Sequence, residues 1–144
     1  MIDVMSFEDL ELKSTVDIIK ACERHSSQSG SVFGRRVKAK GLLSKAEDFV
    51  KYTRGRIATE CRISGSIPGI TKMTDKALGD YVDQHPDMVI ARTNRAEAIM
   101  GLDNANAIVT TYLQNRDMLA LIRSERQNSF HSDVSSSRVG DVQL

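Results

Sequence analysis

The sequence has few of the residues that build sheets, sandwiches or membrane spans. Tryptophan is absent, aromatic residues make up 5%, and there are two prolines among 144 residues. A core of leucine, isoleucine, valine, alanine and methionine with few rings suits helix-on-helix packing better than a sandwich or a barrel. The longest apolar runs fall far short of the roughly 20 residues that a membrane-spanning helix needs. We therefore expect an all-α protein that does not enter a membrane.

The sequence has only two cysteines, and its first residues do not resemble an export signal. The two cysteines, Cys22 and Cys61, fall inside helical patterns and are typical of reduced core thiols in an intracellular protein. The first 13 residues are acidic and lack the apolar core of an export signal. We expect a cytoplasmic location.

Charge is small in total but unevenly distributed. The net charge is +1, yet residues 35–62 carry nine basic and three acidic groups. Residues 1–24 and residues 75–105 each carry three basic and six acidic groups. Such asymmetry indicates an anionic partner, or charge matching within the protein or its oligomer.

The N-terminal part, residues 1–30, is predicted to be an acidic helix and a linker. Ser6 followed by acidic residues is typical of a capped helix start. Leu12, Val16, Ile19 and Cys22 recur at spacings of three and four, which predicts one apolar stripe. The polar run 25–30 should end this helix.

Residues 31–127 are predicted to form a helical hairpin. Its first helix spans about residues 32–62, and its core face, centred on Ala46, is completed by Leu42, Leu43, Phe49, Val50, Thr53, Ile57 and Cys61. A glycine-rich connection over 63–70 and a Thr74-capped short helix over about 75–83 follow. Pro86 then suits the first position of a long helix that reaches about residue 127.

The long helix carries a near-heptad stripe of Ala98, Leu102, Ala105, Val109, Tyr112 and Leu119. A helix of about 40 residues, roughly 60 Å, needs a second long helix or another subunit to cover its apolar side. We therefore expect an antiparallel hairpin with coiled-coil character, and a homo-oligomer. The serine-rich segment 128–144 is predicted to be disordered.

Motifs for catalysis, cofactors and metals are missing. The three histidines lie in or beside predicted loops without cysteine or carboxylate at metal-ligand spacing. No phosphate-binding loop and no nucleophile elbow occurs. We expect a binding protein without cofactor or metal rather than an enzyme.

The basic helix is the chief candidate for a binding site. Arg36, Lys40, Lys51, Arg54 and Arg62 fall about 80° to 160° from its core stripe, while Lys38, Lys45 and Arg56 lie on the opposite flank. Cations spaced along a rigid helix suit phosphate contacts, because each neutralised phosphate releases condensed counterion. A solvated face whose charges pair with the acidic flanks explains the same residues equally well.

The order of these parts resembles a known family. The basic helix ends in Lys51-Tyr-Thr-Arg-Gly-Arg56, a glycine-containing loop and a Thr/Asp-led short helix follow, and His85-Pro-Asp precedes the long helix. That helix ends in the pattern Arg116-Asp-Met-Leu-Ala-Leu-Ile-Arg-Ser-Glu-Arg126. Over residues 35–126 the chain is similar to the UvsY-type recombination mediators of tailed phages.

The resemblance implies an oligomeric ring that binds single-stranded DNA. It also implies two protein partners, a RecA-like recombinase and the single-strand binding protein that the recombinase replaces, in the host cytoplasm. In that family the basic residues before the loop contact DNA, and the matching positions are Lys51, Arg54 and Arg56. With the neighbouring cations, the expected nucleic-acid-binding set is Arg36, Lys40, Lys51, Arg54, Arg56 and Arg62.

Two other functions stay open. The chain could be a phage structural or assembly protein whose long helices serve oligomerisation without DNA binding. It could also be a small regulator that binds a protein of the bacterial host.

Overall fold

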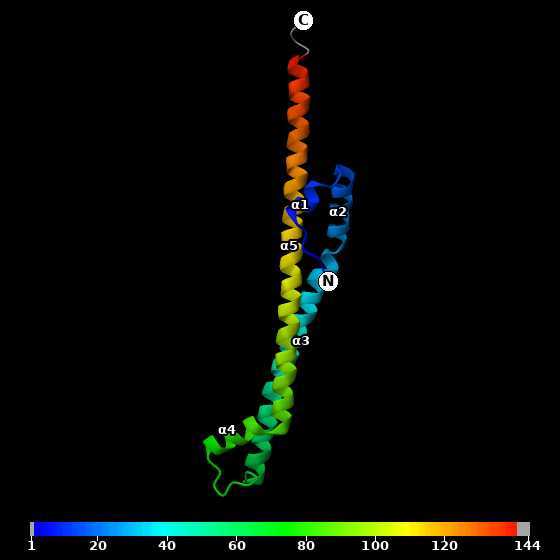
Figure 1. The fold of residues 1–144 in the computed structure, drawn as a ribbon. Coiled ribbons are helices and arrows are strands. Elements are labelled where there is room, and N and C mark those ends of the chain that lie inside the picture. The colour runs from blue at the N-terminus through cyan, green and yellow to red at the C-terminus, as the bar shows by residue number, and fades with distance from the viewer. Residues whose placement is uncertain (1, 141–144) are drawn as a thin grey trace. The chain divides into compact units, whose positions relative to one another are not determined.

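The chain is helical over almost all of the part that the structure describes. The computed structural model describes residues 2–140, with side chains described for residues 2–135. In chain order the helices are α1 (Phe7–Glu11), α2 (Thr15–Ser27), α3 (Ser29–Ser64), α4 (Asp75–Gln84) and α5 (Pro86–Gly140) (Figure 1). Extended pairing within residues 2–140 is limited to one isolated bridge between Ile67 and Ile70. The all-α prediction is confirmed.

The N-terminal segment forms two short helices where the sequence predicted one longer helix. Ser6 caps α1 as predicted, and its hydroxyl accepts a hydrogen bond from the amide three residues further on. Ser14 caps α2 in the same way, so the chain turns between the two helices. Leu12 is 89% exposed in this turn, whereas Leu10 and Ile18 are buried. The predicted stripe is therefore wrong, because a second capping serine interrupts the helical period.

The long basic helix is present as α3 and extends slightly beyond its predicted bounds at both ends. Its predicted core face is confirmed in the second half, where Thr53, Ile57 and Cys61 are buried. In the first half the face is only partly covered, since Leu42 is 53% exposed and Phe49 is 43% exposed. The apolar surface of α3 is thus wider than the part that its neighbours bury.

Two glycines shape the connection between α3 and α4. Gly65 has φ +67° and Gly69 has φ +75°, a region that strains other residues. Gly65 directly follows α3, at the position where a left-handed residue commonly ends a helix. Thr74 caps α4 and Pro86 opens α5, both as predicted.

The last helix is longer than predicted. α5 continues to Gly140, so the prediction of a disordered tail from residue 128 is wrong for residues 128–140. No proline follows Pro86, and nothing in this stretch therefore removes a helical hydrogen bond. The side chains of residues 128–135 are exposed, so this part of the extension buries little surface. Residues 141–144 lie outside the described residues.

The chain divides into two compact units. The central unit is Arg35–Ala105, and the terminal unit joins the chain up to Gly34 with the chain from Asn106 onward. The predicted divisions at residues 30 and 127 differ from these bounds. The reason is that the N-terminal helices pack on the later part of α5 instead of forming a part of their own.

In the central unit α3 and α5 run antiparallel. Glu47 pairs with Arg95, and Arg56, later on α3, pairs with Asp87, earlier on α5. Near the end of α3 the loop and α4 complete the core, whose buried members are Ile57, Cys61, Ile67, Leu78, Val82 and Met88. This core fixes the last two turns of the basic helix.

The terminal unit has two apolar clusters along α5. One joins Leu10 and Ile18 to Leu119 and Ile122, and the other is formed by Val32, Val109 and Tyr112. The predicted stripe of α5 is confirmed at its buried positions, which are Ala105, Val109, Tyr112 and Leu119.

Asn115 lies within this stripe and is 1% exposed. Its Oδ1 accepts a hydrogen bond from the Met5 amide at 2.9 Å, and its Nδ2 donates one to the Asp3 carbonyl at 2.8 Å. One amide side chain therefore satisfies two backbone groups of the N-terminal segment and holds it on α5.

His25 is buried beside the same helix. Its ring stacks on Tyr112 with centroids 4.0 Å apart and planes 11° apart. Neither ring nitrogen has a hydrogen-bond partner of good geometry within residues 2–135. Burial lowers the pKa of His25, and nearby Arg116 lowers it further, while the Tyr112 backbone carbonyl partly opposes both. The ring is consequently favoured in its neutral form.

Candidate nucleic-acid interface

All six predicted binding residues lie on α3 within the central unit, but their environments differ. Lys40, Lys51 and Arg62 are exposed. Arg36 is half-buried and has an interaction of its own. The remaining two, Arg54 and Arg56, form ion pairs within the unit. The predicted set therefore separates into free and paired cations.

Lys40, Lys51 and Arg62, here called the basic row, repeat every eleven residues. Eleven residues make about three helical turns, so the three side chains lie nearly in line and roughly 16 Å apart. Within the part of the chain with described side chains, none of the three takes part in an ion pair or a side-chain hydrogen bond. The basic row thus presents three positive charges without ion-pair partners along one helix.

Arg54 belongs to a cluster around Asp83. Its Nη2 donates to the Asp83 Oδ1 at 3.0 Å, and the Arg92 Nη2 donates to the same oxygen at 2.5 Å. Arg92 also donates to the Asp83 backbone carbonyl. Two guanidinium groups share one carboxylate, so the cluster keeps one positive charge although Arg54 is paired. Arg92 was not among the predicted site residues, because its closeness to Arg54 depends on the chain returning through α4.

Arg56 bridges two acids. It donates to Asp87 at 2.5 Å and to Glu60 at 3.0 Å. The hydrogen bond to Asp87, and then that to Glu60, raises the pKa of Arg56, so its guanidinium stays charged. Here the two carboxylates outnumber the one cation. Arg56 is consequently a poorer phosphate contact than the residues of the basic row.

Glu47 is the main acid on the flank of the basic row, and it is paired. Its carboxylate lies 3.8 Å from the Nε of Arg95 on α5. Arg95 is a second residue outside the predicted set, and its partner lies almost fifty positions earlier in the chain. By offsetting Glu47 it reduces the interruption in the positive strip.

A small hollow adjoins the end of the basic row. Its volume is about 260 Å³, and it is lined by Arg54, Ala58, Arg62, Asp75, Leu78, Gly79, Val82 and Asp83. The lining has two cations and two acids, which gives the hollow no strong preference for an anion. It marks where the acidic face of α4 meets the basic flank of α3.

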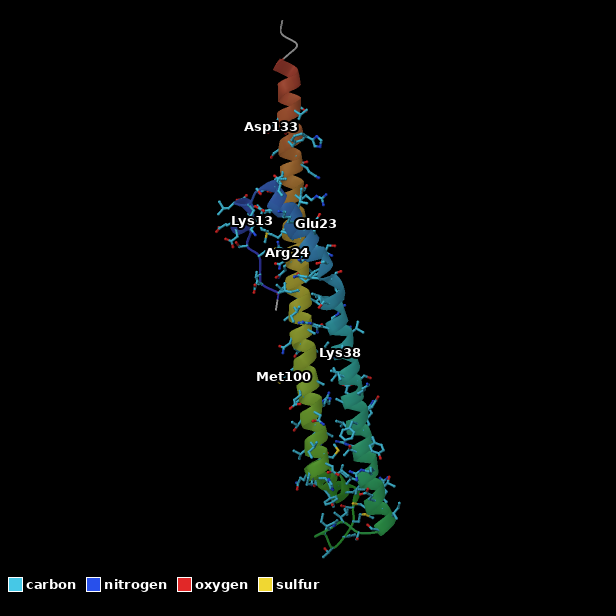
Figure 2. All side chains as sticks on the ribbon, turned by 90° about the vertical axis from the view of Figure 1, so that its right-hand side faces the viewer. Lys13, Glu23, Arg24, Lys38, Met100 and Asp133 are labelled. Carbon is cyan, nitrogen blue, oxygen red and sulfur yellow. The ribbon has the colours of Figure 1, made fainter. Side chains whose placement is uncertain are left out.

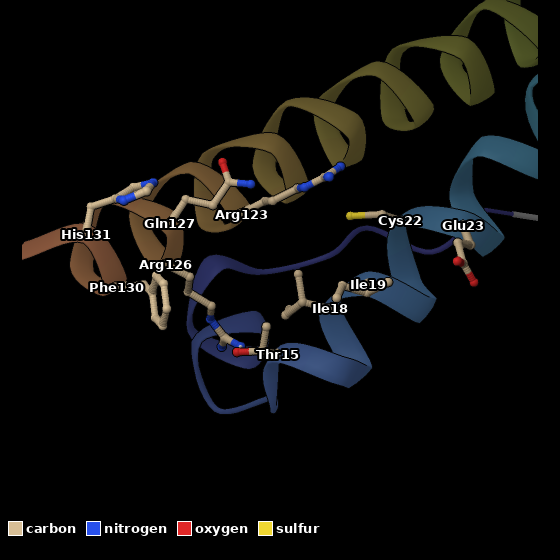
Figure 3. Close-up of a pocket in the computed structure, with 10 residues that line it drawn as sticks. All are labelled: Thr15, Ile18, Ile19, Cys22, Glu23, Arg123, Arg126, Gln127, Phe130 and His131. Carbon is tan, nitrogen blue, oxygen red and sulfur yellow. The ribbon is translucent and has the colours of Figure 1, made fainter. Parts of the chain in front are cut away.

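A larger groove lies in the terminal unit, between α2 and α5 (Figure 3). It measures about 490 Å³, and its lining includes Ile18, Ile19 and Cys22 from α2 and Arg123, Phe130 and His131 from α5. None of the predicted site residues lies there. Arg126, at its edge, donates to the carbonyl of Leu10 in the last turn of α1 and to that of Lys13 in the turn after α1.

Other kinds of site are not found in the described part of the chain. No group of three or more histidine, cysteine, aspartate or glutamate side chains there could hold a metal ion. None of the described helices has both the length and the apolar composition needed to cross a bilayer. No protein-family model, curated protein or solved structure matches the chain.

Proposed function

We propose that the chain is a single-stranded-DNA-binding protein that contacts the phosphate backbone through the basic row. The observation that carries the proposal is the set of three exposed cations at eleven-residue intervals, free of internal partners within the described residues. Arg54 and Arg56, by contrast, are held in ion pairs with acids of the same unit. Lys40, Lys51 and Arg62 form no ion pair among the described side chains.

Binding of this kind is indifferent to base sequence. Lysine and arginine neutralise phosphates and release counterions, and phosphate contacts carry no direct sequence information. Residues 2–140 also form no aromatic-rich sheet of the kind on which sequence-selective single-strand binders stack bases. We expect affinity that is sensitive to salt and nearly independent of oligonucleotide sequence.

The mediator role rests on the resemblance described above. We propose that the bound protein assists a RecA-like recombinase in replacing single-strand binding protein. Adding the protein should then shorten the lag of recombinase filament assembly on a covered strand. Of the positions that the resemblance assigns to DNA contact, Lys51 is the one free of internal pairing, so we expect Lys51 to contribute more than Arg54 or Arg56.

The first prediction is that Lys51→Ala weakens binding of a fluorescent oligothymidylate about threefold or more. For single strands the slope of log affinity against log salt is about −0.7 per neutralised phosphate. Fluorescence anisotropy at several salt concentrations should therefore give a slope that is shallower by about 0.7 for each contact site lost.

Lys20→Ala is the matched control. Lys20 is an exposed lysine on α2, outside the basic row, and its removal changes the net charge equally. Equal losses of affinity in the two variants would show that affinity depends on net charge and not on the position of the lysine. That result would contradict the proposed site.

The alternative is an assembly protein that does not bind DNA. The pairing of Arg54 with Asp83 and of Arg56 with Asp87 favours it, because these cations serve contacts inside the unit. Failure of the parent protein to retain oligonucleotide at low salt would support this alternative and overturn the DNA-binding proposal.

A further inference from the structure

α3 carries a second stripe that its own neighbours leave largely uncovered. Steps of four and three residues generate Lys38, Leu42, Lys45, Phe49, Tyr52, Arg56, Thr59 and Ile63, here called the heptad row. Its apolar members are well exposed: 53% for Leu42, 43% for Phe49, 65% for Tyr52 and 83% for Ile63. Apolar residues at this period form the packing seam of helix bundles, and exposed apolar residues that gather on one helix face mark a candidate interaction site.

A matching row runs along α5 on the same side of the hairpin. It begins at Asp87, which Arg56 of the heptad row binds directly. The same steps of three and four from Asp87 give Ile90, Asn94, Glu97, Gly101 and Asn104, here called the α5 row. Ile90 is 56% exposed, and Met100, beside Gly101, is 65% exposed. The two rows together form one face, two helices wide.

The charges of the two rows are opposite. The heptad row has three cations and no acid, whereas the α5 row has two acids and no cation. Two heptad rows packed on each other would bring like charges together, which is unfavourable. A heptad row packed on an α5 row instead brings lysine to glutamate and covers the exposed Ile90.

We propose that this face binds a second copy of the chain, forming a two-fold dimer in which the α3 of each copy packs on the α5 of the other. A two-fold axis parallel to the hairpin does not change the position of a residue along the helix axis. Residues of α3 and α5 that lie side by side within one copy therefore also lie side by side between the two copies. Glu47 lies opposite Arg95 and Arg56 opposite Asp87. Lys45 of one copy therefore meets Glu97 of the other, and Tyr52 meets Ile90.

The same register places Leu42 near Met100, and Lys38 near Asn104. Lys38 and Met100 mark neighbouring levels of the two antiparallel helices (Figure 2). The result is a four-helix bundle with a partly apolar seam about 27 Å long between Lys38 and Arg56. Such closed two-fold contacts use the same patch on both copies.

This interface is separate from the proposed DNA contacts. Lys40 and Lys51 lie roughly 140° around α3 from the heptad row, at about 100° per residue. Both lysines therefore remain accessible in the dimer. The dimer proposal does not depend on DNA binding, and its test uses no nucleic acid.

The test is the mass of the full chain in solution. Light scattering coupled to size exclusion, at about 100 µM and at moderate salt, should give twice the 16.0 kDa chain mass. Phe49→Glu should raise the dissociation constant of the dimer at least tenfold, as measured by sedimentation velocity over a dilution series. Lys45→Glu should weaken the dimer too, and adding Glu97→Lys should restore it by reversing the pair.

Val37→Glu is the control, because Val37 is also apolar and 69% exposed on α3 but lies outside the heptad row. Circular dichroism establishes that each variant keeps its helices. A monomer at 100 µM, an oligomer with an odd number of copies, equal effects of Val37→Glu and Phe49→Glu, or no rescue by the charge reversal would each overturn the proposal.

Discussion

At the scale of single residues, the terminal unit buries two polar side chains in different ways. Asn115 uses both ends of its amide on the backbone of the N-terminal segment. His25 has only the flat face of Tyr112 against its ring and no good hydrogen bond within the described residues. A satisfied buried group fixes the chain in place, whereas an unsatisfied one costs stability that depends on its protonation state.

His25 should make the terminal unit sensitive to acid. Because burial lowers the pKa of His25 in the folded protein, the unfolded chain binds the proton more readily. Stability is then fully present above the unfolded value of about 6.5 and falls as the pH is lowered from there to the folded pKa. Urea unfolding followed by circular dichroism at pH 7.5 and at pH 5.5 should show this loss.

The comparison variant is His25→Phe, which keeps a ring on Tyr112 and removes the titration. Its loss of stability between the two pH values should be smaller than that of the parent. His131→Gln serves as control, because His131 is exposed and should leave the pH dependence unchanged. An identical pH dependence in the parent and in His25→Phe would contradict this account.

At the scale of elements, helix ends depend on single residues whose effect can be recognised locally. The Ser6, Thr74 and Pro86 starts were predicted because each has a local chemical cause within three residues. Ser14 has the same cause, but the spacing of apolar residues across it favoured one continuous helix. The end of α5 was predicted wrongly because the sequence there has no local signal that ends a helix. A polar, serine-rich stretch without proline is compatible with both helix and disorder.

Alanine substitutions of two glycines, one inside α3 and one directly after it, are expected to change stability in opposite directions. Gly55 lies inside the helix, and an added Cβ there would meet nothing within 4 Å. Gly55→Ala should therefore raise the free energy of unfolding by up to about 1 kcal/mol. Gly65 has φ +67°, so Gly65→Ala should lower it by about 1 to 2 kcal/mol through backbone strain. Urea unfolding of both variants checks the two signs, and the same sign for both would contradict the assigned conformations.

At the scale of the whole chain, the sequence predicted which residues are basic and on which helix, but not which of them are paired. The position of Lys40, Lys51 and Arg62 follows from helical period alone. The pairing of Arg54 requires Asp83, 29 positions later, and Glu47 pairs with Arg95, which follows a loop and a helix. Charge counts along the chain contain no information on these contacts between residues far apart in the sequence. The core of the central unit was harder still to predict, because Ile67 enters it from a glycine-rich loop.

The two units have separate apolar cores, and this predicts that their stabilities respond separately. Leu78→Ala removes buried surface from the central unit, and Ile18→Ala does so from the terminal unit, each at a cost of about 2 to 5 kcal/mol. Native-state hydrogen exchange should then show faster opening mainly of α4 amides in Leu78→Ala and mainly of α2 amides in Ile18→Ala. Because α3 and α5 pass through both units, their amides should show smaller changes that decline away from the substituted core. Equal loss of protection in α2 and α4 in either variant would show instead that the chain opens as one cooperative unit.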